Sequence, residues 1–283
     1  MSKTAKNIRP ALPRRRSQVA AVKKLHWRLG GRAVPEKDLL AREEPLEIRV
    51  RGRSVAVTMR TPGHDRELAA GFLLTERVVL RRKDLIEIAT CTASQEPQNT
   101  LDVFLAPGVT VDFARLTRHV FAASGCGLCG KASIESVKQH FPPVSSKLCL
   151  PARELLQLPG RMRQAQKTFS STGGLHAAAI FNAKGKLLVL REDVGRHNAV
   201  DKVLGQGFLR DALPYGSHIL LVSGRASFEI LQKSLAAGIP IICAVSAPSS
   251  LAVDFARASG QTLVGFLRDE SLNVYTHPER IRF

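Results

Sequence analysis

The sequence predicts an α/β fold in which a layered sheet follows a smaller, β-rich N-terminal part. Three observations predict it. In the second half of the chain, short apolar runs alternate with helical patterns, as in sheets that are covered by helices. Between residues 45 and 105, apolar and polar residues alternate with the period of half-buried strands. The chain has 283 residues, 44% of them hydrophobic, which is enough to bury a full core.

The β-rich part begins with two predicted strands, residues 46–50 and 55–59, in which every second residue is apolar. Residues 64–75 follow with apolar side chains on one helical face, so a helix is expected there. Two more strands are expected at residues 85–91 and 101–105. We place this β-rich subdomain at residues 36–123 and the α/β domain at residues 124–283.

The α/β domain should alternate strands with helices. Two helical pieces, residues 151–158 and 161–169, are expected on either side of Pro159-Gly160. The strands that follow are expected at residues 176–181, 187–190, 219–222, 239–245, 262–267 and 272–275. The helices between them are expected at residues 197–204, 227–237 and 249–258. Sheets of this kind bind ligands in the crevice at the carboxyl ends of their strands.

Two segments of this domain are candidates for binding anions. Ser223-Gly224-Arg225 ends a buried strand and begins a helix, which is a natural position for an anion. In the polar segment 192–202, Arg196 and Lys202 could pair with phosphates. Alternatively, they form internal ion pairs with the acidic residues of the same segment. The sequence leaves both interpretations open.

The positive charge is concentrated at the N-terminus. Ten basic residues precede the first acidic residue, Glu36, and subtracting ten from the formal net charge of +18 leaves +8 for residues 36–283. Residues 1–35 are therefore expected to form a basic, disordered tail. Arg14-Arg15-Arg16 is similar to a twin-arginine export signal, but no apolar segment of ~7–15 residues follows it, so export is not expected.

The composition bears on other classes of protein. No apolar run approaches the roughly 18 residues of a membrane span, so no membrane partner is expected. A basic nucleic-acid-binding protein is the generic alternative for so positive a chain. However, aromatic residues make up 5% of the sequence, with one Trp and two Tyr, which is unfavourable for a platform that stacks bases. The five cysteines are scattered, which favours a reducing, cytoplasmic setting.

The candidate catalytic residues are Cys126 and Cys129. They lie in a glycine-rich turn, residues 125–130, that runs directly into a predicted helix at residues 131–141. The unpaired N–H groups and the dipole of a helix's first turn favour the thiolate over the thiol. Such a thiolate is a good nucleophile and a good acceptor of sulfur. The other three cysteines, Cys91, Cys149 and Cys243, are expected to pack in the core.

Several kinds of site fit this cysteine pair. A zinc site would need two further ligands, which no second pair supplies. A thiol-disulfide oxidoreductase that uses Cys126 and Cys129 is an alternative, although such motifs usually stand near the start of a domain. A dinucleotide site would need a strand before the glycines, and residues 115–124 make a poor strand. Two ordinary structural cysteines and a sulfur-accepting thiolate are the remaining interpretations.

A series of short motifs stands in order from about residue 45 to the C-terminus. They are Met-Arg-Thr-Pro-Gly (59–63), Glu-Leu-Ala-Ala-Gly-Phe-Leu-Leu-Thr-Glu (67–76), Ser-Gly-Cys-Gly-Leu-Cys-Gly-Lys (124–131), Thr-Gly-Gly-Leu-His (172–176), Glu-Asp-Val-Gly-Arg-His-Asn-Ala-Val-Asp-Lys (192–202), Ser-Gly-Arg-Ala-Ser-Phe-Glu (223–229), Ser-Ala-Pro-Ser-Ser-Leu-Ala (246–252) and Thr-Leu-Val-Gly-Phe-Leu-Arg (262–268). Together they resemble the formate dehydrogenase accessory sulfurtransferases. The basic tail lies outside this resemblance.

The resemblance implies a cytidine deaminase-like α/β fold and a sulfur-carrier role. The chain would accept sulfur from a cysteine desulfurase as a persulfide on Cys126. It would pass this sulfur to molybdenum bis(molybdopterin guanine dinucleotide) before that cofactor enters formate dehydrogenase. The residues expected at the cofactor, including the strand–helix junction, are Phe266, Leu267, Arg268, Asp269, Glu270, Ser271, Ser223, Gly224 and Arg225.

The same resemblance bears on metals and on assembly. A zinc-dependent deaminase would need a His-x-Glu element followed by Pro-Cys-x-x-Cys. No His-x-Glu precedes the cysteine pair, and Cys126 follows a glycine, so neither zinc nor any other metal ligand set is expected. Because the cofactor presents two guanine nucleotides related by approximate symmetry, we expect a two-fold homodimer.

Overall fold

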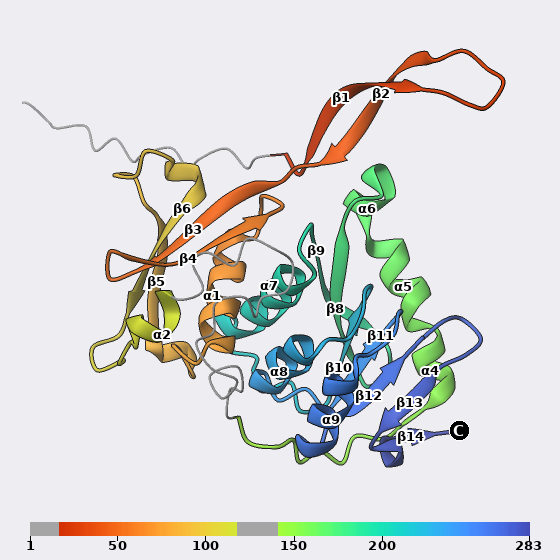
Figure 1. The fold of residues 1–283 in the computed structure, drawn as a ribbon. Helices are drawn as coiled ribbons and strands as arrows, with labels where there is room; N and C mark the ends of the chain where they lie inside the picture. The colour runs from red at the N-terminus through yellow and green to blue at the C-terminus, as the bar shows by residue number, and fades with distance from the viewer. Residues whose placement is uncertain (1–16, 118–140) are drawn as a thin grey trace, which may run out of the picture.

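The computed structural model describes residues 17–117 and 141–283. Within these residues, the strands lie in two main sheets, one of four strands and one of six, with helices between and around them (Figure 1). A two-stranded hairpin projects from the body near the N-terminus. The four-stranded sheet comes from the β-rich part of the sequence, and the six-stranded sheet comes from the second half.

The four-stranded sheet supports one helix. Its strands are β3 (Glu44–Val50), β4 (Arg53–Arg60), β5 (Leu85–Thr90) and β6 (Thr100–Leu105). Their order is β4-β3-β6-β5, with β3 and β6 parallel and the other neighbours antiparallel. Helix α1 (Asp65–Thr75) buries Leu68 and Leu73 in the same apolar cluster as Leu46 of the sheet. A short helix, α2 (Phe113–Thr117), follows β6.

The six-stranded sheet is mixed. Its strands are β8 (His176–Asn182), β9 (Leu187–Asp193), β10 (His218–Val222), β11 (Ile241–Ala244), β12 (Thr262–Gly265) and β13 (Asn273–Thr276). Their order is β13-β12-β11-β10-β8-β9. The three central strands β10, β11 and β12 are parallel, whereas β8 is antiparallel to β9 and β10, and β13 is antiparallel to β12.

Helices cover both faces of the six-stranded sheet (Figure 1). One face packs against α7 (Arg196–Leu209), α8 (Phe228–Ala236) and α9 (Ser250–Ala258). The other face carries α4 (Ala152–Leu156), α5 (Leu158–Ala165), α6 (Lys167–Thr172) and the short pair β7 (Leu150–Pro151) and β14 (Ile281–Arg282). The side chains of β10 alternate between the two faces of the sheet. Leu220 is buried in the core under α7, α8 and α9, and Ile219 and Leu221 are buried in the core under α4 and α5.

A close contact between α1 and α7 joins the two halves. A Cβ at Gly71 of α1 would lie 1.9 Å from the carbonyl oxygen of Asp201, and a Cβ at Gly205 of α7 would lie 1.8 Å from that of Glu67. At such distances only glycine fits, so the two glycines let the helix backbones touch. Phe208, near the end of α7, is buried in the apolar cluster of the four-stranded sheet.

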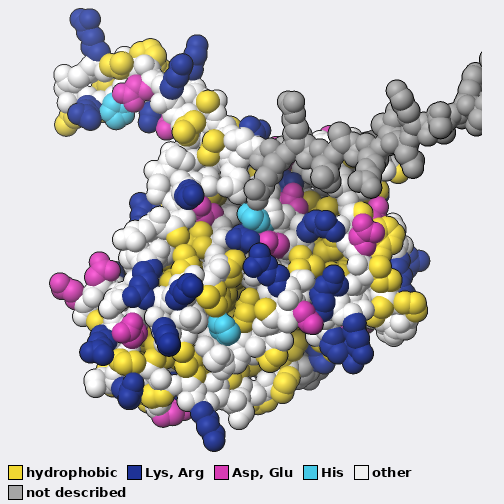
Figure 2. Space-filling model, turned by 180° about the vertical axis from the view of Figure 1, so that it is seen from behind, with side chains coloured by type: hydrophobic (Ala, Val, Ile, Leu, Met, Phe, Trp, Pro, Cys, Tyr) yellow, Lys and Arg dark blue, Asp and Glu magenta, His cyan; other side chains and the backbone are white. Residues whose placement is uncertain are grey.

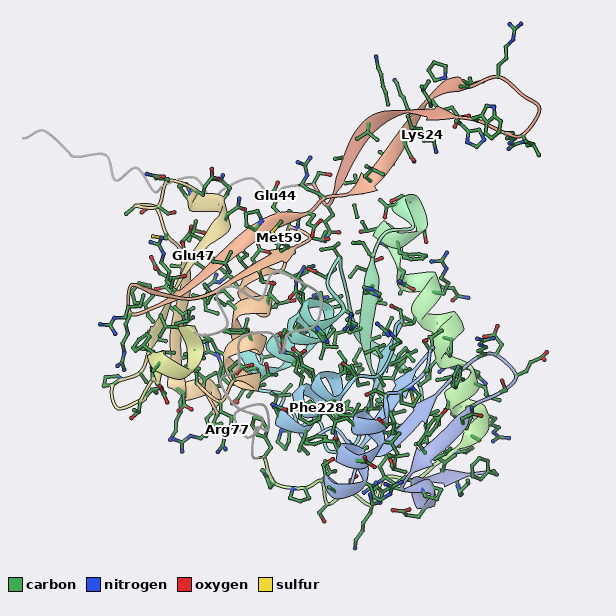
Figure 3. All side chains as sticks on the ribbon, in the orientation of Figure 1. Lys24, Glu44, Glu47, Met59, Arg77 and Phe228 are labelled. Atoms are coloured by element: carbon green, nitrogen blue, oxygen red, sulfur yellow. The ribbon has the colours of Figure 1, made fainter. Side chains whose placement is uncertain are left out.

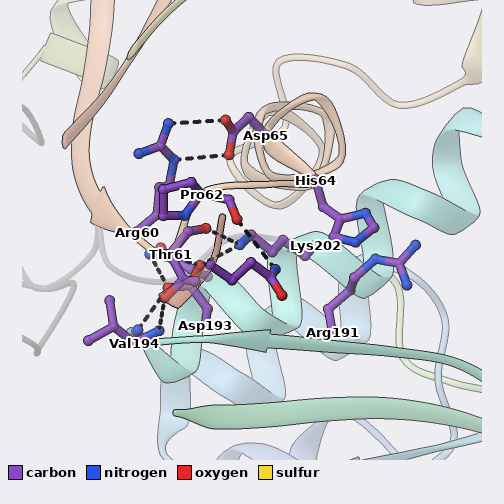
Figure 4. Close-up of polar contacts among 12 residues, drawn as sticks. Arg60, Thr61, Pro62, His64, Asp65, Arg191, Asp193, Val194 and Lys202 are labelled. Atoms are coloured by element: carbon purple, nitrogen blue, oxygen red, sulfur yellow. Dashed lines mark hydrogen bonds and ion pairs between the residues drawn. The ribbon is translucent and has the colours of Figure 1, made fainter. Parts of the chain in front are cut away.

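Two buried ion pairs lie beside this contact, and Figure 4 shows the residues of the first, Lys202 and Asp193. The Lys202 ammonium lies 2.6 Å from the Asp193 carboxylate and donates to the carbonyl oxygen of Thr61 at 2.8 Å. The N–H of Thr61 donates to Asp193 in turn. One residue earlier on α7, Asp201 accepts from Lys233 of α8 at 2.8 Å. Removing one member of such a buried pair typically costs about 3–5 kcal/mol, because the other charge is left uncompensated.

The α/β class is confirmed, and strands form at the expected positions in both parts. The helices predicted at residues 151–158 and 161–169 are instead three, α4, α5 and α6, with a break at Gln166, and α7 is longer than predicted. Helix α5 runs through Pro159 and Gly160, because a proline is tolerated in the first turn, where its missing N–H would have no partner. Helix α7 continues to Leu209, beyond the predicted end at residue 204, because Gly205 serves the contact with α1 and does not end the helix.

The described part of the expected tail is folded. Strands β1 (Val19–His26) and β2 (Val34–Ala41) pair in an antiparallel hairpin, so the boundary expected at residue 35 falls inside a strand. Blocks of apolar residues, such as 19–22 and 39–41, flank the charged residues of this hairpin, and the sequence interpretation gave weight to the charge alone. Residues 1–16 and the boundary expected at residue 123 lie outside the described residues.

Replacing Gly205 with alanine should destabilise the protein strongly, because the new methyl group would overlap the Glu67 carbonyl oxygen and force α1 away from α7. We expect the free energy of unfolding, measured by urea denaturation, to fall by about 3 kcal/mol or more. Gly160→Ala in α5 is the matched control, since no atom lies within 4 Å of its added Cβ. This control should be neutral or stabilising by ~0.5–1 kcal/mol. Equal stabilities of the two variants would contradict the contact.

Candidate functional site

The parallel strands β10, β11 and β12 end at one edge of the six-stranded sheet, which we call the carboxyl edge. Strand β8 begins there because it is antiparallel to β10, and its first residue, His176, pairs with Asp193 at the end of β9. The loops after the parallel strands, residues 223–227, 245–249 and 266–272, complete this edge.

The three loops are hydrogen-bonded to one another. The N–H of Ala226 donates to the carbonyl oxygen of Ala247 at 3.2 Å, which ties the first loop to the second. The N–H of Phe266 donates to the carbonyl oxygen of Ser246 at 3.1 Å, which ties the third loop to the second. The two segments predicted to bind the cofactor therefore lie along one edge, with the middle loop between them.

The residues of the first loop have different environments. The Ser223 hydroxyl accepts a hydrogen bond from the N–H of Ala177 at 2.9 Å, so its oxygen extends the pairing of β8 with β10. A Cβ at Gly224 would lie 3.4 Å from Nδ1 of His176, so this glycine is close to the imidazole. Arg225 is exposed. Of these three predicted residues, Arg225 is the one whose charged side chain is open to a ligand.

The third loop combines a fixed backbone with an exposed ring. Phe266 has a positive φ of 50°, and its side chain is 37% exposed. Such a backbone conformation is unfavourable for a residue with a side chain and persists only where its surroundings hold it. The next residue, Leu267, is fully buried in the core, so its side chain is not available to a ligand. The remaining side chains are exposed, namely Arg268, Asp269, Glu270 and Ser271.

His197, like His176, was considered as a catalytic group from the sequence, but neither was among the predicted site residues, since a lone histidine more often serves as a satisfied hydrogen-bonding group. His197 is the second residue of α7, and its Nε2 lies 3.3 Å from the carboxylate of Glu229 on α8. Burial lowers the pKa of His197 to about 3, and the positive charges of Lys233 and Arg196 act in the same direction. The imidazole is therefore neutral at pH 7. A dense polar motif in the sequence was the available signal, but it did not show which of its members are buried together.

Arg196 places a cation beside this histidine. Its Nε atom is buried and has no hydrogen-bond partner among the residues that the structure describes. The pKa of His176 is lowered by burial and then by the charge of Arg196, which places the two side chains near each other. An arginine with an unused donor can bind a phosphate or carboxylate oxygen.

Segment 192–202 was predicted either to bind phosphates or to form internal ion pairs, and each interpretation applies to different residues. Lys202 is fully buried against Asp193, so it serves the fold. Glu192 accepts hydrogen bonds from the backbone N–H groups of Thr168 and Phe169, at 3.0 and 2.7 Å, and is likewise internal. Arg196, with its free donor atom, is the residue of this segment that fits an anion.

Helix α7, with 14 residues, and α8 and α9, with nine each, all begin at the carboxyl edge (Figure 1). In Figure 3 the label of Phe228 marks the first residue of α8. The unpaired N–H groups and the dipole at a helix N-terminus favour negative charge. Together with Arg196 and Arg225, these three helix ends make the edge suitable for an anionic ligand such as a phosphate.

Cys126 and Cys129 lie outside the described residues, together with nearly all of the helix expected after them. Of the other cysteines, Cys91 and Cys243 are buried as predicted. Cys149 is exposed, which corrects the expectation that it packs in the core. It directly precedes β7, and the side chain of the following residue, not that of Cys149, points into the core.

Within residues 17–117 and 141–283, no three His, Cys, Asp or Glu side chains are grouped so as to hold a metal ion. The predicted absence of zinc stays a prediction. One His-x-Glu sequence stands after the cysteine pair, and there His277 lies 3.1 Å from Glu279 and 3.1 Å from the carbonyl oxygen of Arg257. Both of its ring nitrogens are thus used locally. In the described part of the chain, no helix is long and apolar enough to cross a membrane.

Comparison with protein families identifies the chain's relatives. A family model described as the FdhD/NarQ family matches residues 41–282, which include both sheets and every motif noted above. The chain belongs to the FdhD/NarQ family. The resemblance drawn from the sequence motifs is thereby confirmed.

Curated relatives in this family carry the name sulfur carrier protein FdhD. The relative from Mycobacterium bovis is 53% identical over 257 residues, which cover 88% of this chain and 93% of the relative. The relative from Saccharolobus solfataricus is 42% identical over 252 residues, with coverage of 88% and 93%. A crystal structure from Desulfotalea psychrophila, described as a formate dehydrogenase accessory protein, is similar with a TM-score of 0.74 and 28% identity, over 94% of this chain and 100% of that chain.

The buried, neutral His197 should make the protein less stable as the pH falls below 6.5. Its pKa is about 3 in the folded protein and 6.5 when unperturbed, so between these values the unfolded chain binds the additional proton. This one group should lower the free energy of unfolding by up to about 1.4 kcal/mol for each pH unit in that window.

The measurement is urea denaturation of the parent and of His197→Gln between pH 6.5 and 4.5. Below pH 4.5, carboxylates such as Glu67, whose pKa is lowered to about 2, contribute in both proteins. The variant should show a flatter dependence of stability on pH, because it lacks the titrating imidazole. A slope equal to that of the parent would show that His197 is not held neutral by burial.

Proposed function

We propose that this chain carries sulfur to the molybdenum cofactor of formate dehydrogenase. The Cys126 thiolate attacks the outer sulfur of a persulfide on a cysteine desulfurase. A new S–S bond forms on Cys126, the S–S bond of the donor breaks, and the donor cysteine leaves as a thiolate. The S–S bond on Cys126 then breaks, Cys126 leaves as a thiolate, and the outer sulfur passes to the substrate, molybdenum bis(molybdopterin guanine dinucleotide), which supplies the electron pair of the new bond. This transfer precedes the entry of the cofactor into formate dehydrogenase.

The observation that carries this proposal is the match of 88% of the chain to relatives named sulfur carrier proteins. The geometry of the carboxyl edge supports the nucleotide part of it. Arg196 and Arg225 supply cations near three helix N-termini, which suits the phosphates of a guanine nucleotide. The exposed ring of Phe266 offers a flat apolar surface for the base.

The proposal also covers the oligomeric state of the chain, its cellular compartment and its partner proteins. We infer a two-fold homodimer, in which each protomer offers one guanine nucleotide an equivalent site. We place the chain in the cytoplasm, where thiols stay reduced, and name a cysteine desulfurase and formate dehydrogenase as its partners. The mixed sheet with helices on both faces supports the proposed relation to the cytidine deaminase fold.

Cys126→Ala should abolish the activation of formate dehydrogenase in cells that lack the native protein, because the thiolate that accepts sulfur is gone. Cys129→Ala should have a milder effect. Cys149→Ala is the matched control, since this cysteine is also exposed but stands outside the pair, and it should restore full activity. Full activation by the Cys126 variant would refute the mechanism.

Arg225→Ala should weaken the binding of GDP by roughly 1.5–3 kcal/mol, the range for a hydrogen bond to a charged group. Isothermal titration should also show weaker binding as salt is raised, and better binding of GDP than of ADP. Arg257→Ala is the control, because it removes the same charge from the last turn of α9, away from the carboxyl edge. Equal affinities for GDP and ADP, or equal effects of the two variants, would argue against this site.

A further inference from the structure

The hairpin β1-β2 and its flanking residues, 17–42, form an arm that projects from the body (Figures 1 and 2). Gln18 anchors its base by donating to the carbonyl oxygen of Pro62 at 3.3 Å and accepting from the hydroxyl of Thr168 at 2.9 Å. A two-stranded hairpin that stands alone in water is marginally stable. An arm of this kind is therefore well suited to gain its stability from a partner.

The arm exposes large apolar side chains, of which Trp27 and Leu29 lie in its turn and the others on its two strands. These are Leu25, Trp27, Leu29, Val34, Leu39 and Leu40, with Trp27 58% and Leu29 92% exposed. The indole N–H of Trp27 donates to the carbonyl oxygen of Gly31 at 3.0 Å, which fixes the ring at the tip. An exposed, pre-positioned tryptophan among apolar residues is typical of a protein-binding surface.

The two faces of the arm differ in charge. On one face Lys24 is paired with Asp38 at 3.0 Å (Lys24 is labelled in Figure 3). On the other face Lys23 stands directly opposite Lys37. Like charges at such positions destabilise a hairpin unless negative charge lies against them. The face with Lys23 and Lys37 therefore fits a surface that is acidic and partly apolar.

The arm stands beside the carboxyl edge. Ala41, at the end of β2, lies against Gly174, two residues before β8, where a Cβ on the glycine would come within 3.6 Å of the alanine side chain. Thr168, which holds Gln18, is next to Phe169, whose N–H binds Glu192 of β9. A protein that binds the arm is consequently brought to the edge where the anion site lies.

We propose that the arm binds an acidic, partly apolar groove on the formate dehydrogenase that receives the cofactor, and that it holds this enzyme over the carboxyl edge. The proposal rests on the function proposed above.

Charge complementarity favours this partner over a second copy of the chain. The arm has six basic and two acidic residues, which is a net charge of +4. Residues 36–283 carry +8, ten less than the +18 of the whole chain. Binding of the arm to a second copy of the chain would therefore bring two positively charged surfaces together.

The test measures binding of the full chain to purified, cofactor-free formate dehydrogenase from the same organism by biolayer interferometry. The double variant Lys23→Glu, Lys37→Glu should raise the Kd by about tenfold or more, and Trp27→Ala by about 30-fold. Lys184→Glu, Lys186→Glu is the matched control, since it makes the same change of charge in the exposed turn between β8 and β9, at the opposite edge of the sheet. This control should bind as the parent does.

GDP binding and sulfur loading of Cys126 are measured on the same proteins and should be unchanged in the arm variants, which separates the arm from the proposed function. Parent-like affinity of both arm variants for the enzyme would overturn the role of the arm alone. A parent chain that neither binds the enzyme nor carries sulfur would overturn the proposed function with it. Arm variants that shift the chain's own monomer–dimer equilibrium, or its affinity for a DNA duplex, while binding the enzyme normally would also overturn the proposal.

Discussion

The backbone contact between α1 and α7 is the constraint on which the rest of the structure depends. Gly71 and Gly205 leave no room for a side chain where the helices meet, so the four-stranded sheet is fixed to the six-stranded sheet through two helix backbones. The buried pairs of Lys202 with Asp193 and of Asp201 with Lys233 lie beside this contact. Because they are satisfied only in this arrangement, they set the position of α7 and hence of its N-terminus at the carboxyl edge.

This constraint gives a structural role to two of the sequence motifs, residues 59–63 and 192–202. In the first, the guanidinium of Arg60 forms two hydrogen bonds with the Asp65 carboxylate, at 2.9 and 3.0 Å, and closes the turn before α1 (Figure 4). In the second, Asp193 and Lys202 bind the backbone of Thr61 in that turn. Arg60 therefore fixes the turn itself, and Asp193 and Lys202 hold this turn against the second half of the chain. Arg196 and His197 begin α7 shortly after Asp193, so the contact of Asp193 with Thr61 helps to set their position at the candidate site.

Much of the fold could be predicted from the sequence, because the strands of both sheets carry clear periodic patterns. The placement of Ser223–Arg225 and Phe266–Ser271 at one edge followed from the rule that parallel strands end together. Other features depend on contacts between distant segments, which one sequence does not display. The predicted helix stopped at residue 204, next to Gly205, because the partner of this glycine, Glu67, lies far away in the chain. Leu267 was expected at the ligand because motif membership does not distinguish a buried side chain from an exposed one.

In the proposed function, the carboxyl edge binds the cofactor and the arm binds the enzyme that receives it. The edge offers cations and helix ends to a nucleotide, and the arm rises beside it with apolar and basic side chains exposed. The chemistry of the proposed function depends on the Cys126 thiolate, which carries the sulfur. Mass spectrometry of the chain purified without reductant tests this claim most directly. The account predicts an added mass of about 32 Da, one sulfur atom, on the peptide that contains Cys126 and not on the peptide with the exposed Cys149. A peptide with unmodified Cys126 after incubation with a cysteine desulfurase and cysteine would contradict it.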